Sequence, residues 1–83
     1  LTNGAKGLMT STIYGVASYR KAGRTHVRQR LDHYTESRVA SFAARGMAQS
    51  QAGVMMYSVS GSGDFWTEPE VLLAFGDCPP RPL

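Results

Sequence analysis

The spacing of apolar and polar residues predicts a β-hairpin in the first part of the chain. Residues 10–19 are rich in Thr, Tyr, Ile and Val, which favour a strand. Gly15 interrupts the alternation, and we expect a bulge or a close backbone approach there. Residues 25–34 alternate as a second strand, and Gly23 between them suits the left-handed conformation that short hairpin loops require.

The period then changes from that of a strand to that of a helix. Residues 35–37 (Thr-Glu-Ser) offer a hydroxyl cap and a carboxylate for a helix N-terminus. Apolar or small residues follow at i, i+3, i+4, i+7 and i+8, which is one stripe of an amphipathic helix. The stripe consists of Val39, Phe42, Ala43, Gly46 and Met47. Gly46 on this stripe indicates close packing of the helix against a sheet, and Gly53 is a plausible end signal.

Two interpretations compete for residues 68–75. Thr67 with Glu70 three positions later forms a capping box, and Gly76 can end a helix, which together predict a short helix. The apolar run 71–75 is also compatible with a strand. The capping box decides in favour of the helix.

These elements predict an α+β domain with a small antiparallel sheet. The order is β-β-α-β, followed by a short C-terminal helix or a fourth strand, with one long helix packed on one face of the sheet. The third strand spans residues 54–59, and the glycine-rich residues 60–64 form a flexible connection. Residues 9–76 form the single domain. Residues 1–8 are an upstream remnant or a disordered leader, and residues 77–83, with their three prolines, form an extended tail.

Length and composition exclude several classes of protein. A chain of 83 residues forms one domain, and its single cysteine, Cys78, cannot make an internal disulfide. No apolar run approaches the roughly 20 residues of a membrane span. There is no signal-peptide pattern, so we expect a cytoplasmic protein. Because so small a core is marginal, we also expect that a homodimer could form through an edge strand.

The net charge of +3 conceals a polarised chain. Residues 1–45 carry eight basic and two acidic side chains, whereas residues 46–83 carry one basic and four acidic side chains. Five of the eleven residues from 20 to 30 are basic and none is acidic. The candidate contact residues are therefore Arg20, Lys21, Arg24, His26, Arg28 and Arg30.

The hairpin predicts how these charges are arranged. The tip of the hairpin would carry Arg20, Lys21 and Arg24. Strict alternation would place Arg28 and Arg30 together on an open face of the second strand, with Val27 and Leu31 on the opposite face.

Such a surface is typical of a small non-catalytic binding module for a polyanion, with nucleic acid as the first expectation. The alternative is an inhibitor or adaptor, of the kind that phages and mobile elements encode, which acts on an acidic protein surface. The sequence does not choose between DNA, RNA and protein.

The two histidines and the cysteine do not predict a reaction centre. His26, His33 and Cys78 lack the spacing of metal ligands, so no metal, cofactor or catalytic residue is expected. A nucleophile–base pair of Cys78 with a histidine would require the tail to fold back.

Overall fold

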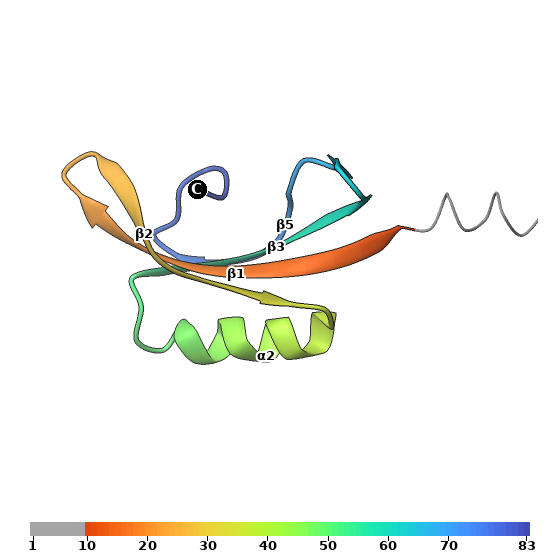
Figure 1. The fold of residues 1–83 in the computed structure, drawn as a ribbon. Helices are drawn as coiled ribbons and strands as arrows, with labels where there is room; N and C mark the ends of the chain where they lie inside the picture. Colours follow the sequence, from red (N-terminus) through yellow and green to blue (C-terminus); the bar gives the residue numbers. More distant parts are fainter. Residues whose placement is uncertain (1–9) are drawn as a thin grey trace, which may run out of the picture.

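The fold is a mostly antiparallel β-structure with one helix. The computed structural model describes residues 10–83, and the proposed leader 1–8 lies outside this range. The elements are β1 (Ser11–Ala22), β2 (Thr25–Tyr34), α2 (Ser37–Met47), β3 (Gly53–Ser62), β4 (Phe65–Trp66) and β5 (Glu70–Gly76). The sheet order is β2-β1-β3-β4, and β5 also pairs with β3, so β1 and β3 are central (Figure 1). The predicted small antiparallel sheet with one helix is confirmed.

The two faces of the sheet are covered by different parts of the chain. The helix α2 lies on one face, which we call the helix face, and residues 77–83, the tail, lie over the other, which we call the tail face (Figure 1). Residues 77–83 contain no helix or strand, but they pack back on the sheet instead of extending from it.

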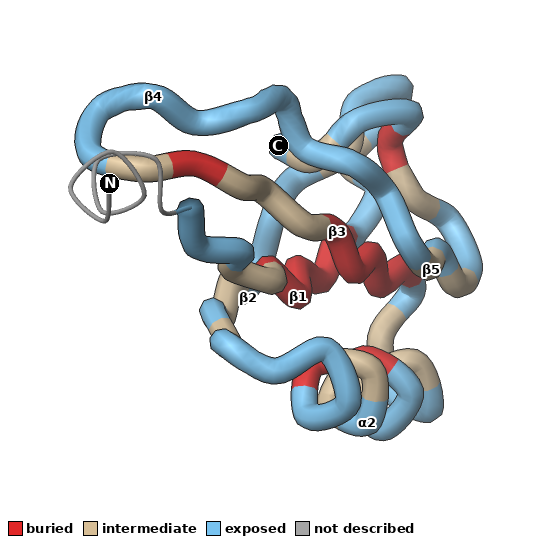
Figure 2. Tube along the Cα trace, turned by 90° about the vertical axis from the view of Figure 1, so that its right-hand side faces the viewer, coloured by how far each residue is buried: buried red, intermediate tan, exposed pale blue. Residues whose placement is uncertain are grey.

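Burial is concentrated on β1 and β3 because both of their faces are covered (Figure 2). On the helix face, Val16, Val54 and Met56 pack with alanines of α2. On the tail face, Tyr19 and Met55 form a second cluster. A strand that is buried on both faces has little alternation in its sequence, which explains the uneven pattern of residues 10–19.

The predicted hairpin is confirmed, and its turn has the expected geometry. Gly23 has a φ of 66° and forms the two-residue turn with Arg24. Pairing of β1 with β3 ends at Tyr19, which is opposite Gly53. Residues 20–27 therefore continue past the sheet as a two-stranded segment, which we call the ribbon (Figure 1).

A β-bulge changes which face the second strand presents. Ser18 pairs with Arg30, and the next residue, Tyr19, pairs with Arg28, so Gln29 is an extra residue without a partner on β1. Because consecutive residues of β1 point to opposite faces, Arg30 lies on the helix face and Arg28 on the tail face. The prediction that Arg28 and Arg30 line one open face is therefore wrong.

The same bulge separates the two apolar residues of β2. Leu31 pairs with Ala17 and packs in the cluster of the tail face. Val27 pairs with Arg20 and falls on the helix face, beyond the part of the sheet that α2 covers. The expected shared face of Val27 and Leu31 is thus also wrong.

The helix is shorter than predicted, with 11 residues, and it buries a different stripe. Ala40 and Ala44 are fully buried against the sheet, whereas the Phe42 side chain is 81% exposed. A Cβ at Gly46 would meet nothing within 4 Å, so this glycine is not a point of close packing. Small alanine side chains let the helix lie close to the sheet, and this close approach decides which stripe is buried.

Residues 70–76 form a strand, so the predicted short helix is wrong and the alternative of a fourth strand is confirmed. Thr67 does not cap a helix. Its hydroxyl oxygen accepts a hydrogen bond from the Ser60 N–H at 3.0 Å, and its own N–H donates to the Ser60 carbonyl at 2.8 Å. These bonds hold the chain between β4 and β5 in extended pairing with β3.

Candidate functional site: the basic hairpin

Three of the six predicted contact residues lie in the ribbon with free side chains. Arg20 is opposite Val27, Lys21 is opposite His26, and Arg24 is in the turn. All three cations are exposed. Within residues 10–83, no hydrogen bond or ion pair engages their side chains. These three groups are therefore available to an external anion.

His26 lies in the same ribbon but is bonded to the tail. Its Nε2 is 2.9 Å from the Asp77 Oδ1, and the imidazole is 15% exposed. An ionised carboxylate can only accept a hydrogen bond, so Nε2 carries the hydrogen. The hydrogen bond from His26 lowers the pKa of Asp77. His26 thus fixes the start of the tail in this structure.

Arg28 holds the end of the tail. Its Nη1 donates to the Leu83 carbonyl oxygen at 2.9 Å, while the Leu83 N–H donates to the Tyr19 hydroxyl at 3.1 Å. Burial raises the pKa of the neighbouring Tyr57 phenol, an effect that the Tyr19 phenol reinforces and the Arg28 charge partly offsets. The tail face that was predicted to be open at Arg28 is occupied by this segment.

Arg30 belongs to the helix face and has a partner of its own. Its Nε donates to the Asp32 Oδ2 at 2.7 Å, and the Arg30 side chain is well exposed. An exposed ion pair of this kind is screened by solvent and contributes little to stability. The six predicted residues therefore separate into three free groups in the ribbon and three groups with contacts inside the protein.

Sequence reasoning missed the tail as part of this site. The prolines of residues 77–83 suggest an extended segment. In the structure Pro79 is buried, and Asp77 supplies an acidic side chain next to the basic hairpin. The separation of charge between the two halves of the chain was the signal that could have predicted the contact of Asp77 with the hairpin.

The tail does fold back, yet it does not bring Cys78 to a histidine. The Cys78 Sγ lies 3.3 Å from the carbonyl oxygens of both Val54 and Phe75. Burial raises the pKa of the Cys78 thiol, so the protonated form is favoured. Among residues 10–83, no three side chains of His, Cys, Asp or Glu gather as metal ligands.

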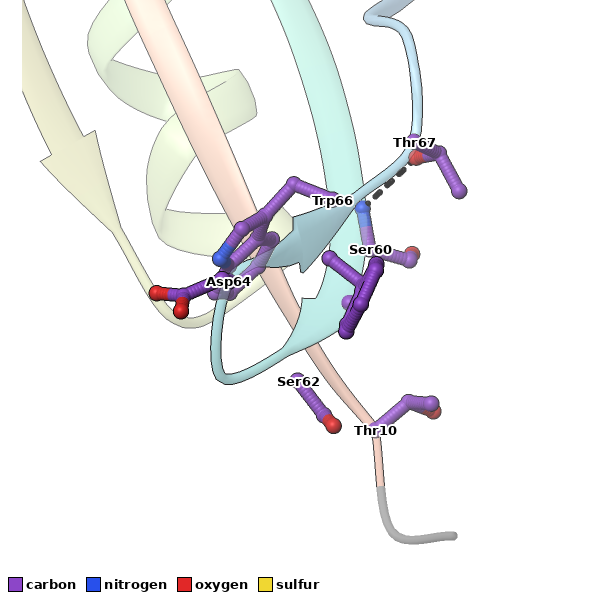
Figure 3. A pocket seen from close by; sticks show the side chains of 8 residues that line it. Thr10, Ser60, Ser62, Asp64, Trp66 and Thr67 are labelled. Atoms are coloured by element: carbon purple, nitrogen blue, oxygen red, sulfur yellow. Dashed lines mark hydrogen bonds between the residues drawn. The ribbon is translucent and has the colours of Figure 1, made fainter.

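A separate concave surface of about 450 Å³ lies at the β3–β4 turn (Figure 3). Its lining includes the hydroxyl groups of Ser60, Ser62 and Thr67, with Asp64 at the turn (Figure 3). The Trp66 indole N–H donates to the Gly63 carbonyl at 2.9 Å, which fixes the ring. The Asp64 carboxylate makes this surface unfavourable for a phosphate group.

Comparison with known proteins leaves the function to be argued from geometry and charge. In the described part of the chain, no helix has both the length and the apolar character needed to cross a bilayer. No protein-family model, curated protein or solved structure matches the chain significantly.

Proposed function

We propose that the protein is a small non-catalytic binding module whose ribbon contacts the phosphate backbone of a nucleic acid in the cytoplasm. The observation that carries the proposal is the group of Arg20, Lys21 and Arg24, which are exposed and unpaired among residues 10–83 on a segment that projects beyond the sheet. No acidic residue occurs between residues 20 and 30. The Asp77 carboxylate, which is bonded to His26, interacts with the Lys21 charge, so Arg20 and Arg24 are the ribbon cations that carry most of the attraction for an anion.

The shape of the ribbon supports a nucleic-acid partner. A two-stranded antiparallel ribbon is one of the few protein elements that fit the major groove of B-form DNA. Three phosphate contacts release counterions, and the logarithm of the binding constant is then expected to fall with the logarithm of salt concentration with a slope of about −3. Contacts of this kind position the protein without reading a base sequence.

The test compares two variants with the same change in net charge. Fluorescence anisotropy with a labelled duplex and a labelled single strand at low salt measures the affinity. Arg20→Gln with Arg24→Gln removes two charges of the ribbon, and the control, Arg38→Gln with Arg81→Gln, removes two exposed charges elsewhere. We expect the ribbon variant to lose at least tenfold in affinity and to lower the salt slope by about 2, since each phosphate contact accounts for about 0.9.

Two results would overturn the proposal. One is the absence of binding to any nucleic acid at low salt, and the other is an equal loss of affinity in the ribbon variant and its control. Equal loss would mean that overall charge, and not the ribbon, attracts the nucleic acid.

The second candidate function is an inhibitor or adaptor that binds an acidic protein surface. It is favoured by apolar groups that a nucleic acid does not use: Phe42 is 81% exposed on the outer side of α2, and the neighbouring Val39 is also exposed. This candidate predicts a single protein partner whose affinity falls both with Arg24→Gln and with Phe42→Ser, while nucleic acid does not bind.

A further inference from the structure

The basic groups on the tail face of the hairpin form a row that continues from the ribbon onto the sheet. Lys21 pairs with His26, and two positions further along β2, Arg28 pairs with Tyr19. Tyr19 belongs to the cluster of the tail face, and alternation along both strands places the other three side chains on the same face. An anion that binds the ribbon therefore lies next to this row.

The tail lies over this face beside the hairpin (Figure 1) and gives an oxygen atom to two groups of the row. The Asp77 carboxylate is bonded to His26 and also interacts with the Lys21 charge. The Leu83 carbonyl accepts the hydrogen bond from Arg28. Phosphate oxygens are acceptors of the same kind, so the tail takes the positions that phosphates would take on this row.

The two parts of the tail are held with different strength. Residues 77–79, the inner tail, are anchored, because the Asp77 N–H donates to the Ala52 carbonyl at 2.9 Å and Pro79 is buried. Residues 80–83, the outer tail, make their hydrogen bonds to the rest of residues 10–83 only at Leu83. A hollow of about 470 Å³ lies between the outer tail and residues 68–71. The outer tail can therefore lift while the inner tail stays in place.

We propose that the outer tail is an autoinhibitory contact that restricts a bound nucleic acid to the ribbon. While the Leu83 carbonyl holds Arg28, this guanidinium is engaged inside the protein. When the outer tail lifts, Arg28 becomes a fourth phosphate contact beside the three cations of the ribbon. The inference rests on the proposed function and names a regulation of the same site.

The contact to be broken is weak compared with the contact that replaces it. Arg28 and Leu83 are both exposed, and hydrogen bonds that exchange with water contribute little to stability. A bond from an arginine to a charged phosphate is stronger than a bond to a neutral carbonyl. The affinity of the four-contact mode is reduced by the fraction of molecules in which the outer tail is lifted, so loosening the tail should raise it.

The test loosens the outer tail without changing the charge of the protein. Tyr19→Phe removes the hydroxyl that accepts the Leu83 N–H, and Leu83→Pro removes the donor of the same bond at an exposed position. The matched control, Tyr14→Phe, makes the same change on the helix face. In the free protein, nitrogen-15 relaxation of the Arg81 amide should show greater motion in both tail variants than in the wild type and the control.

Fluorescence anisotropy with a labelled DNA duplex then measures affinity against salt concentration. Both tail variants should bind about two- to fivefold more tightly at low salt, and the control should bind like the wild type. The salt slope should steepen from about −3 to about −4, since each phosphate contact adds about 0.9. In the Tyr19→Phe background, Arg28→Gln should return the slope to about −3. Arg30→Gln, which removes the same charge from the helix face, should leave it near −4.

The outcomes separate this inference from the proposed function. If the wild type binds the duplex and folded tail variants bind with the same affinity and salt slope, the inference is overturned and the proposed function stands. A gain that persists after Arg28→Gln, or an Arg81 amide that is no more mobile in either tail variant, also overturns the inference. Absence of binding in every variant at low salt overturns both. Circular dichroism verifies the fold, and the exposed position of Leu83 keeps the test valid if Tyr19→Phe unfolds the protein.

Discussion

Replacing Gly15 with alanine tests whether the tail face is packed as tightly as the structure shows. The new Cβ would lie 2.6 Å from the Tyr57 hydroxyl oxygen and 2.8 Å from its Cε1. Ordinary contacts are about 3.5–4.0 Å, so the ring must move by about 1 Å. Tyr57 is buried, and a change of this kind in a packed core typically costs about 1–3 kcal/mol.

The unfolded state offsets part of this cost. Alanine restricts the unfolded chain more than glycine does, which stabilises the protein by about 0.4–1 kcal/mol. With both ranges taken at their midpoints, the expected net effect of Gly15→Ala is a loss of about 1.3 kcal/mol in the free energy of unfolding. For a domain of this size, that corresponds to a decrease in Tm of roughly 5–10 °C.

Urea denaturation followed by circular dichroism measures the effect, and Gly46→Ala is the matched control. Because a Cβ at Gly46 has open space in a helix, this second change should stabilise the protein by about 0.5–1 kcal/mol. In a Tyr57→Leu background, Gly15→Ala should cost little. If Gly15→Ala is as stable as the wild type, the close approach of Tyr57 to the strand is refuted.

Two substitutions and one reaction rate probe the helix and the tail. Ala44→Leu should destabilise the protein by about 1–3 kcal/mol, because it overfills the contact of α2 with the sheet, and thermal unfolding will measure this loss. The pKa of Asp77 is lowered, so its bond to His26 stabilises the fold above the ordinary pKa of 3.8 and this contribution disappears as the pH falls below that value. Asp77→Asn should therefore be less stable than the wild type at pH 6 and equally stable near pH 2, as judged by urea titrations at both values. The Cys78 thiol should react slowly with a disulfide reagent at pH 7.5, because burial raises its pKa, and a rate equal to that of free cysteine would contradict its placement.

The hairpin could be predicted because its signals are local. Strand-forming residues, a glycine at the turn and a change of period at residue 35 are all visible in the sequence. The bulge could not be predicted, since nothing about Gln29 distinguishes it from a residue in regular pairing. One extra residue was enough to reverse the faces of Arg28 and Val27.

The helix and the last strand show how tertiary contacts override local signals. The amphipathic period correctly predicted a helix, but it placed Phe42 on the buried stripe. In the structure Ala40 and Ala44 are buried instead, because their small side chains let the helix approach the sheet closely. The capping box at Thr67 was a genuine local preference. In the folded protein the Thr67 hydroxyl instead accepts a hydrogen bond from the Ser60 N–H, and the apolar run that follows pairs with β3.

The positions of the site residues could thus be predicted only in part from the sequence. The tip cations Arg20, Lys21 and Arg24 lie where the hairpin predicts them. The contacts of His26 and Arg28 depend on a tail more than fifty residues away in sequence, and no local pattern encodes such a separation.

The β-hairpin has a consequence for how a double helix could be approached. Arg20 and Lys21 are consecutive in β1 and point to opposite sides of the ribbon. A groove in duplex DNA is bordered by two phosphate walls, one from each strand. A ribbon that enters the groove with one of these cations toward each wall would neutralise phosphates of both DNA strands at once. A hairpin with all its charge on one side could only lie flat against a single strand.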